Sequence, residues 1–238
     1  MFAHTGKTRT SNHNLGIASL LSFVAGLVNV VGFFSVAKLT TNVTGHFAFF
    51  VDEAFRINYI TALHVALYVF FFFVGAFISN IMVETFSRIS ENYTYIFPVL
   101  LEAAILAIVA LGGQVFIKSN PDIIAFSLLF AMGLQNSLVT TISNSVVRTT
   151  HLTGLFTDMG IEFSQLFFYK SREQKEKLLK SIKLRLTIIW MFFAGGIVGG
   201  SLFENFGIKS LMGGALLLLA GLLFDFIKIR LLLLKRKL

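Results

Sequence analysis

The stretch GLQNSLVTTISNSVVRTTHLTGLFTDMGIE, residues 133–162, contains the features from which the fold of this chain follows. It begins inside a long apolar run, continues through a Thr-rich segment that is poor in helix formers, and ends in a short apolar piece at about residues 153–169. A helix needs about 20 apolar residues to cross a bilayer. The pattern therefore predicts a full membrane helix followed by a half-helix that is too short to cross.

The same order of features occurs once more, nearer the N-terminus. The sequence GLVN at residues 26–29 matches GLQN at residues 133–136, and both lie inside long apolar runs. The motif TNVTG at residues 41–45 matches THLTG at residues 150–154, at nearly the same separation from the first match. Because order and spacing are kept, the chain is predicted to contain an internal structural repeat.

We expect the two repeats to cover about residues 15–83 and 122–204. Each contains a short apolar piece after its motif, at about residues 44–56 in the first repeat and 153–169 in the second. If these pieces re-enter the membrane, the repeats are inverted relative to each other, and if they cross it, the repeats run parallel. The shortness of both pieces favours re-entrant half-helices and an inverted repeat.

The composition places residues 1–238 in a single transmembrane domain. The chain is 55% hydrophobic and 13% charged, with 28 Phe and a mean hydropathy of +0.79, whereas soluble domains carry about 25% charged residues. A soluble enzyme or nucleic-acid-binding protein is excluded. With its two half-helices, the predicted fold is an all-α polytopic membrane protein whose six full transmembrane helices lie at about residues 15–36, 58–83, 95–117, 122–147, 186–204 and 208–230.

The net charge of +8 is concentrated in short segments between the apolar runs. Such segments mark the cytoplasmic side of a membrane protein. The N-terminal Lys7 and Arg9 and the tail at residues 228–237 are also basic, so we expect both termini in the cytoplasm. The most basic segment, predicted as a cytoplasmic loop at about residues 170–185, holds Lys170, Arg172, Lys175, Lys177, Lys180, Lys183 and Arg185. Because Glu173 and Glu176 each stand four residues before a lysine, we expect this loop to form a helix that faces water or the headgroups.

The two TxxTG motifs are the main candidates for a substrate site. Each places hydroxyl groups and a glycine at the predicted N-terminus of a half-helix, where free N–H groups and the positive end of the helix dipole attract an anion. Thr44 and Thr153 also fit ordinary N-caps, and Asn29 and Asn136 also fit interhelical hydrogen bonds. The predicted substrate-binding residues are Thr41, Thr44, Gly45, His46, Thr150, His151, Thr153, Gly154, Asn29 and Asn136.

Acidic residues in or beside the membrane are candidates for coupling transport to a proton or a cation. Asp158 and Glu162 are one turn apart on the second short helix, and Glu53 occupies the position of Glu162 in the first repeat. Glu102 lies inside a predicted full helix and is expected to face the bundle interior, because a charge at the membrane centre costs about 2.5–3.5 kcal/mol. Alternatively, the acids of the short helices lie near the membrane interface or pair structurally with Arg148 or Arg56.

Two regions of the chain resemble a known family. TTNVTGHF from Thr40 and the stretch quoted above from Gly133 are similar to the hallmark regions of the YoaK family, and the resemblance extends from about Gly16 to the last apolar run. This is a family of bacterial inner-membrane proteins of unknown function, in which Asn usually occupies the position of His46. The resemblance implies a multi-pass inner (plasma) membrane protein, and such families are loosely regarded as small-molecule permeases.

The function predicted from these features is that of a small permease or secondary transporter. Repeats with half-helices at matching positions are typical of such proteins, and the expected substrate is a small anion or weak acid, bound where the two motifs meet. The expected partners are the lipid bilayer, this solute and a second copy in a homodimer, with no nucleic acid. Because the chain has no Cys and no GxSxG, HExxH or P-loop motif, we expect no enzyme, cofactor or metal. The alternatives are an integral-membrane enzyme acting on a lipid-like substrate and a non-transporting membrane partner protein.

Overall fold

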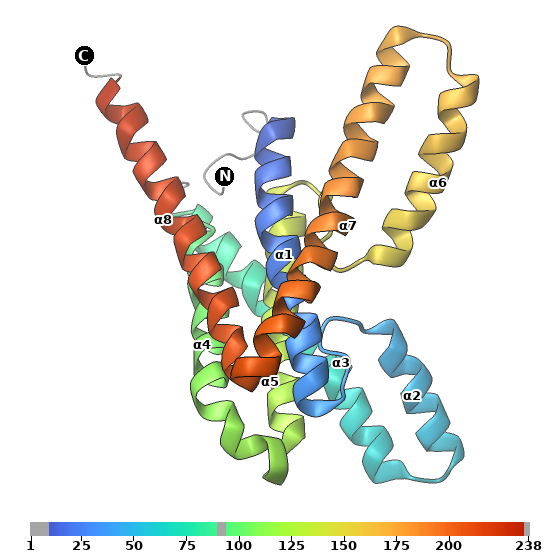
Figure 1. Cartoon of the computed structure of the whole chain (residues 1–238), viewed down its shortest axis with the longest axis vertical. Helices are drawn as coiled ribbons and strands as arrows, with labels where there is room; N and C mark the ends of the chain where they lie inside the picture. Colours follow the sequence, from blue (N-terminus) through green and yellow to red (C-terminus); the bar gives the residue numbers. More distant parts are fainter. Residues whose placement is uncertain (1–9, 90–93, 236–238) are drawn as a thin grey trace.

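The computed structural model describes residues 10–89 and 94–235, and within these residues the chain is all-helical (Figure 1). Lys7, Arg9, Arg236 and Lys237, from which the positions of the termini were predicted, lie outside the described residues. The elements are α1 (Ser11–Val36), α2 (Thr44–Phe55), α3 (Tyr59–Ser87), α4 (Ile96–Ser119), α5 (Pro121–Ile142), α6 (Leu152–Phe168), α7 (Arg172–Phe206), the 3₁₀ turn η2 (Gly207–Ser210) and α8 (Leu211–Lys235).

Several of these helices are long and apolar enough to cross a membrane. On the outer face of α3, Phe70, Phe73 and Phe77 are more than half exposed, which suits contact with lipid rather than water. The chain is therefore a multi-pass, all-α membrane protein, as predicted. The candidate spans are Asn12–Val36, Tyr59–Ser87, Ile96–Ser119, Pro121–Ile142 and Arg172–Lys228, the last of which contains α7, η2 and α8.

Each short helix starts part-way along the bundle and runs back towards the end that the preceding long helix has reached. In Figure 1, α1 runs downward, residues 37–43 turn back up, and α2 runs down again to meet α3. In the other half, α5 runs upward, residues 143–151 turn back down, and α6 runs up again to meet α7. The short helices thus lie beside the bundle and point in opposite directions.

Left-handed backbone conformations end the long helices before both motifs. Ala37, at the end of α1, has a φ of 55°, and Asn144 and Ser145, just after α5, have φ of 52° and 65°. These values interrupt the right-handed helix. The prediction that the fourth full helix continues to residue 147 is wrong, because α5 ends at Ile142.

The segment predicted as a basic loop at residues 170–185 is helical from Arg172 onward and forms the first half of α7. The side chain of Ser171 caps this helix by accepting a hydrogen bond of 3.2 Å from the N–H of Gln174. One turn further, Lys177 donates to Glu173 at 2.7 Å. A cap and charge pairs one turn apart keep this hydrophilic segment helical.

Glycines bring α1 and α7 into backbone contact. A methyl group placed on Gly26 would lie 1.9 Å from the carbonyl oxygen of Phe192, and one on Gly195 would lie 1.9 Å from the carbonyl oxygen of Phe23. Neither position can hold a side chain unless the helices move apart. Small residues allow this close approach, which strengthens van der Waals packing in a membrane.

The helices α3 and α5 cross in the same way. A methyl group on Gly133 would lie 2.1 Å from the carbonyl oxygen of Phe72, and one on Gly75 would lie 2.1 Å from that of Phe130. Gly133 of α5 is the first residue of GLQN, and Gly26 of α1 is the first residue of GLVN. The other two glycines, Gly75 of α3 and Gly195 of α7, lie in the long helices that follow the two motifs. The two tightest helix crossings therefore use corresponding elements of the two proposed repeats.

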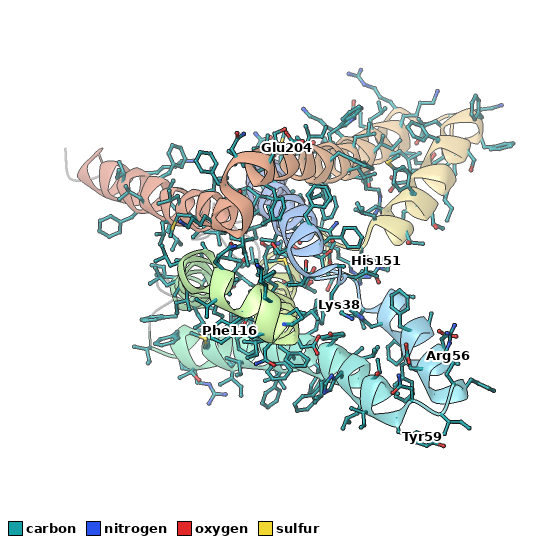
Figure 2. The ribbon with its side chains drawn as sticks, turned by 60° about the horizontal axis from the view of Figure 1, so that its bottom comes forward. Lys38, Arg56, Tyr59, Phe116, His151 and Glu204 are labelled. Atoms are coloured by element: carbon teal, nitrogen blue, oxygen red, sulfur yellow. The ribbon has the colours of Figure 1, made fainter. Side chains whose placement is uncertain are left out.

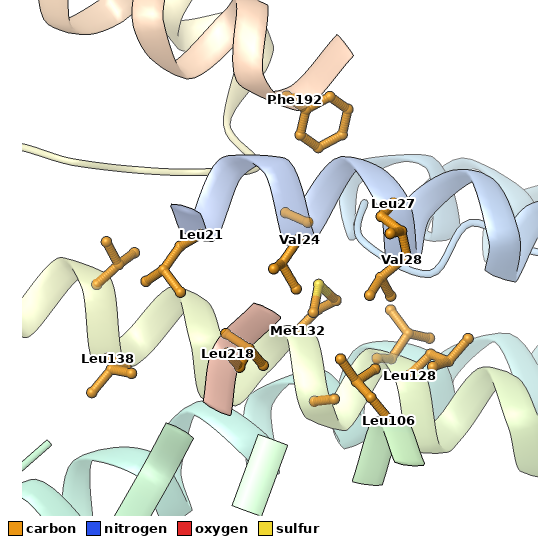
Figure 3. Close-up of a cluster of buried hydrophobic side chains, with 14 of the residues drawn as sticks. Leu21, Val24, Leu27, Val28, Leu106, Leu128, Met132, Leu138, Phe192 and Leu218 are labelled. Carbon is orange, nitrogen blue, oxygen red and sulfur yellow. The ribbon is translucent and has the colours of Figure 1, made fainter. Parts of the chain in front are cut away.

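A core of aliphatic side chains lies between these crossings (Figure 3). In lipid such side chains gain mainly from close packing, because acyl chains are as apolar as leucine. By contrast, α2 packs mainly on α3 and α6 mainly on α7, so both short helices lie at the edge of the bundle. The core residues that are at most 1% exposed include Leu21, Val24, Leu27 and Val28 of α1, Leu106 of α4, Leu128, Met132 and Leu138 of α5, and Leu218 of α8.

Candidate functional site

The two TxxTG motifs line one cavity of about 600 Å³. Non-helical backbone on both sides of it, at residues 37–43 and 143–151, is tolerated in a membrane where it lines a cavity or is buried in protein. Figure 2 shows Lys38 and His151 between the α2 and α6 hairpins, and Arg56 and Tyr59 at the outer tip of the first hairpin. The lining consists of Thr41, Asn42, Val43, Thr44, Gly45, Ala48, Phe72, Thr150, His151, Leu152 and Thr153.

One hydrogen bond ties each motif to the long helix before it. The hydroxyl of Thr41 donates to Oδ1 of Asn29 at 2.7 Å, and the hydroxyl of Thr150 donates to Oδ1 of Asn136 at 2.9 Å. The two bonds join equivalent residues of the two proposed repeats. Asn29 and Asn136 are absent from the cavity lining; each bonds to the non-helical segment that carries a motif, and not to another helix as the alternative of interhelical hydrogen bonds predicted.

A second, deeper set of bonds anchors the same segments. The hydroxyl of Thr40 donates to the carbonyl oxygen of Val28 at 3.3 Å. In the other half, the fully buried Gln135 donates from Nε2 to the carbonyl oxygen of Leu21 at 3.0 Å and to the hydroxyl of Thr149 at 3.1 Å. The threonine before each motif was not among the predicted site residues, although its place in the TT pair of both copies was a usable signal.

Both short helices begin at the cavity. Val43 is the N-cap of α2 and His151 that of α6, so the alternative in which Thr44 and Thr153 serve as N-caps is wrong. In α2, Oδ1 of Asn42 accepts a hydrogen bond of 2.9 Å from the N–H of Gly45. The first turn of a helix carries N–H groups without intrahelical partners and the positive end of the dipole, so both helix starts favour negative charge in the cavity.

A second cavity of about 460 Å³ adjoins the first one at His151, which lines both. It lies between residues 145–151, α6 and α7 and contains two arginines, Arg148 and Arg185. Gly154, the last residue of the second motif, lines this cavity rather than the first. Its other lining residues are Ser145, Val146, Leu155, Asp158, Ser181 and Leu184.

The structure brings Asp158 and Glu162 together around Arg185. Nη1 of Arg185 donates to Oδ2 of Asp158 at 2.8 Å, and its Nε donates to Oε2 of Glu162 at 3.0 Å. The hydroxyl of Ser181 donates to the other oxygen of Glu162 at 2.6 Å. The acids thus have an arginine partner, as the alternative interpretation expected, but this partner is Arg185 of α7 and not Arg148.

The other two candidate coupling acids lie elsewhere. Glu53, near the C-terminal end of α2, accepts a hydrogen bond of 3.0 Å from Nδ2 of Asn58, and both side chains are exposed. Glu102 is fully buried in α4, which confirms that it faces the interior, and neither of its carboxyl oxygens has a hydrogen-bond partner among the described residues. The structure does not bring Glu53 or Glu102 to the lining of the two cavities.

His46 lies beside the first motif, inside the protein, and is 1% exposed. It is not part of the lining of the first cavity, although it directly follows Gly45. Its Nε2 lies 2.7 Å from the carbonyl oxygen of Leu39. Its ring lies 4.9 Å from the ring of Tyr68, measured between centroids. Lys38 also faces this tyrosine, with Nζ 5.9 Å from the centre of the Tyr68 ring.

A polar chain that was missed in the sequence continues from Tyr68 to the surface. The hydroxyl of Tyr68, on α3, donates a hydrogen bond to Asp122 at the start of α5. The other carboxyl oxygen of Asp122 lies 3.2 Å from Nδ1 of His64, whose side chain is 48% exposed. Spacing along one helix indicates that His64 and Tyr68 are one turn apart, but no local pattern places Asp122 next to them.

The surroundings of His46 act on its pKa in opposite directions. Burial lowers the pKa below its ordinary value, the hydrogen bond to Leu39 raises it, and the positive charge of Lys38 lowers it further. Burial has the largest influence, because desolvation disfavours the charged imidazolium. The neutral ring is therefore favoured.

Comparison with known proteins agrees with these features. A family model described as "Protein of unknown function (DUF1275)" matches residues 17–224, which run from α1 into α8. The chain is also similar to the UPF0700 transmembrane protein YoaK of Bacillus subtilis (strain 168), with 25% identity over 185 residues that cover 76% of this chain and 80% of that protein. No solved structure matches the chain.

Proposed function

Because this chain belongs to the DUF1275 family of membrane proteins, whose function is unknown, we propose from the geometry of its site that it is a small permease. In this proposal it is a secondary transporter that binds a small anion or weak acid between the two TxxTG motifs. It carries out no chemical reaction and requires no cofactor. The substrate crosses the membrane through the region where the half-helices meet.

The observation that carries this proposal is the shared cavity of the two motifs. Segments far apart in the sequence, at residues 41–45 and 150–153, line the same space, and each begins a helix there. Two helix N-termini of opposite direction supply free N–H groups and positive dipole ends to one ligand, while Thr and Asn side chains supply further donors. A small anion uses both features.

The arrangement of helices supports an inverted repeat. Counting α7 and α8 as separate crossings gives six full transmembrane helices, and α2 and α6 are the re-entrant half-helices. In this arrangement α1, α2 and α3 correspond to α5, α6 and α7, which run in the opposite direction in Figure 1. The paired glycine crossings and the paired Asn–Thr hydrogen bonds join equivalent residues. Transporters with inverted repeats bind their substrate where the broken helices meet and expose it alternately to each side.

The distribution of charge supports an orientation in the inner membrane. The basic first half of α7 lies at the same end of the molecule as the start of α1 and the end of α8 (Figure 1). The positive-inside rule makes this end cytoplasmic. The cavity that contains Arg148 and Arg185 then becomes the cytoplasmic vestibule, where the arginines receive or release the anion.

A binding experiment on the purified protein tests the substrate site. Thermal unfolding in detergent is measured with chloride, nitrate, formate and benzoate, since a ligand stabilises the folded state by RT ln(1 + [L]/Kd). At least one anion is expected to raise the Tm, and Thr44→Ala together with Thr153→Ala is expected to reduce this shift. Thr157→Ala is the matched control, because within the described residues its hydroxyl bonds to the carbonyl oxygen of Thr153 on the same helix and to no other group.

Uptake into proteoliposomes distinguishes the three functional hypotheses. A permease gives saturable, protein-dependent uptake of the anion that stabilises the purified protein. A membrane enzyme gives turnover of a lipid-like compound without flux, and a partner protein gives neither but copurifies with a fixed subunit. Absence of binding and of uptake for all four anions would overturn the proposal.

A further inference from the structure

A chain of polar side chains on the α2–α3 side leads from the surface to His46. It consists of His64 and Asp122 at the surface, Tyr68 below them, and His46 in the interior. Resting on the proposed permease function, we propose that His46 is the proton-binding site that couples anion transport to proton transport. The substrate and the coupling ion would then enter together from the side opposite to the basic half of α7.

The tautomer of His46 follows from its hydrogen bond. A carbonyl oxygen can only accept, so the contact of 2.7 Å between Nε2 and Leu39 means that Nε2 carries the hydrogen. Nδ1 then holds the lone pair of the neutral ring. This atom is buried and has no hydrogen-bond partner among the described residues. His46 therefore contains a basic nitrogen in the interior that is free to accept one proton.

The charges around His46 determine when this proton binds. Lys38 from the connecting segment is positive, and Tyr68 from α3 is neutral and donates its hydroxyl hydrogen to Asp122 of α5. On α2 itself, the acids lie in the last turns, where Asp52 pairs with Arg56 and Glu53 accepts from Asn58. No carboxylate among the described residues is paired with His46, so an anion in the adjacent cavity supplies the negative charge that stabilises the imidazolium.

Anion binding and proton binding are then reciprocal. An anion at the start of α2 favours the protonated form of the residue that follows Gly45, and the protonated form in turn favours the anion, because coupling between two ligands is symmetric. In the second half, the position of His46 is occupied by the buried Leu155. The second half therefore has no imidazole at this position, and in the proposal one proton accompanies one anion.

The route to solvent follows the same side chains. Asp122 is 30% exposed and so is reached by water, and its hydrogen bond with Tyr68 links it to the interior. In the proposed route, a proton passes from Asp122 to the Tyr68 oxygen while the Tyr68 hydroxyl turns towards His46, whose ring lies 4.9 Å away between centroids, and releases its own hydrogen to Nδ1. Atoms and charge balance, because one proton enters at Asp122 and one reaches His46. Tyr68 controls the rate of this transfer and not the number of protons bound.

Calorimetry in two buffers with different ionisation enthalpies tests the proposal on the full-length protein. The titrants are the four anions chloride, nitrate, formate and benzoate, and the readout is the number of protons taken up per anion at pH 6 to 8. The wild-type protein is expected to take up a proton with the anion, and its affinity is expected to rise by up to about tenfold per unit decrease in pH. Binding without proton uptake would overturn the proposal and leave the permease function intact, whereas no binding of any anion overturns the function itself.

Single-residue variants identify the side chain that binds the proton. His46→Gln keeps an amide that can donate to Leu39 but lacks a basic nitrogen, so proton uptake is expected to fall at least fivefold and the affinity to become insensitive to pH. Tyr68→Phe is expected to keep the equilibrium proton count and to slow the proton uptake, followed by stopped flow, at least several-fold. His13→Gln, on the exposed first turn of α1, is the control and should behave as the wild type. An unchanged proton count in a folded His46→Gln protein would show that another residue binds the proton.

Discussion

In the first half of the molecule, Thr41 bonds to Asn29, and in the second half, Thr150 bonds to Asn136. The glycine contacts between α1 and α7 resemble those between α3 and α5. The groups that surround the two short helices, however, differ. The first half places His46 against Tyr68, whereas the second half places Asp158 and Glu162 against Arg185. The comparison indicates that the repeated positions hold the backbone of the cavity, while the positions that vary give each side its own electrostatic character.

The largest loss of stability is expected from substitution of the glycines at which two helix backbones are in contact. Gly26→Ala and Gly133→Ala place a methyl group within about 2 Å of a carbonyl oxygen, so each is expected to lower the free energy of unfolding by about 3 kcal/mol or more. The Tm of the detergent-purified proteins, or their yield where folding fails, measures this loss. A large difference between the two variants would break the structural equivalence of the halves.

Gly112→Ala provides the control for these two variants. No atom lies within 4 Å of a methyl group at this position of α4. The substitution removes backbone freedom from the unfolded chain and is expected to be neutral or to stabilise by up to about 1 kcal/mol. Destabilisation of the same size as in Gly26→Ala would mean that loss of any helical glycine, and not the crossing, causes the effect.

The next largest loss of stability is expected from the ion pairs, and it should differ between the two halves. Arg185→Met leaves Asp158 and Glu162 without their shared partner, and because Glu162 is only 12% exposed, a loss of about 2 kcal/mol is expected after allowance for the exposure of Asp158. Arg56→Met removes an ion pair whose arginine is 70% exposed and should cost less than about 0.5 kcal/mol. Equal losses in thermal unfolding would contradict this difference between the halves.

A smaller and equal effect is expected from the two asparagines. Asn29→Leu and Asn136→Leu each remove the hydrogen bond that ties a motif to the long helix before it, and such a side-chain bond in a membrane protein contributes about 0.6–2 kcal/mol. Asn136→Leu also removes the bond from its Nδ2 to the carbonyl oxygen of Met132 on the same helix. The two losses should be similar and should add in the double variant, since the residues hold different segments. Asn58→Ala, which removes an exposed contact to Glu53, should stay within about 0.5 kcal/mol of the wild type.

The smallest effect concerns the pH dependence of stability, and it is specific to the first half. Burial lowers the pKa of His46 in the folded protein, so the unfolded chain binds more protons as the pH falls through about 6.5. The stability contributed by neutral His46 is therefore present above this pH and is lost below it. The Tm of His46→Gln should fall less between pH 7.5 and 5.5 than that of the wild type, whereas a steeper fall would reverse the expected sign.

Much of the architecture was predictable because it depends on local chemistry. Long apolar runs and the shortness of the pieces after TNVTG and THLTG are enough to indicate full and partial helices. The end of α5 was placed too late, because residues 143–147 include apolar Val146 and Val147 and their composition alone does not reveal the positive φ at Asn144 and Ser145. Similarly, the charge pairs of residues 172–185 predicted a helical segment, but not that it continues into the following membrane helix as the first half of α7.

The candidate site was predictable only in part, for a physical reason. Repetition of the motif predicted that the two copies meet, and they share one cavity. Partners from different helices were not predictable, because pairing of Arg185 with Asp158 and Glu162, or of Asp122 with Tyr68, requires helices to pack in a particular rotation. That rotation is determined by the glycine contacts between α1 and α7 and between α3 and α5.

The sequence by itself determined that this chain is a multi-pass helical membrane protein in which a TxxTG motif occurs twice, because hydropathy, charge and motif order are properties of the sequence alone. Only the tertiary structure decided which charges face one another, which hydroxyls hold the motifs in place, and which histidine lies buried beside the cavity. These features depend on distances between residues far apart in the chain, and close packing of α1 on α7 and of α3 on α5 sets those distances.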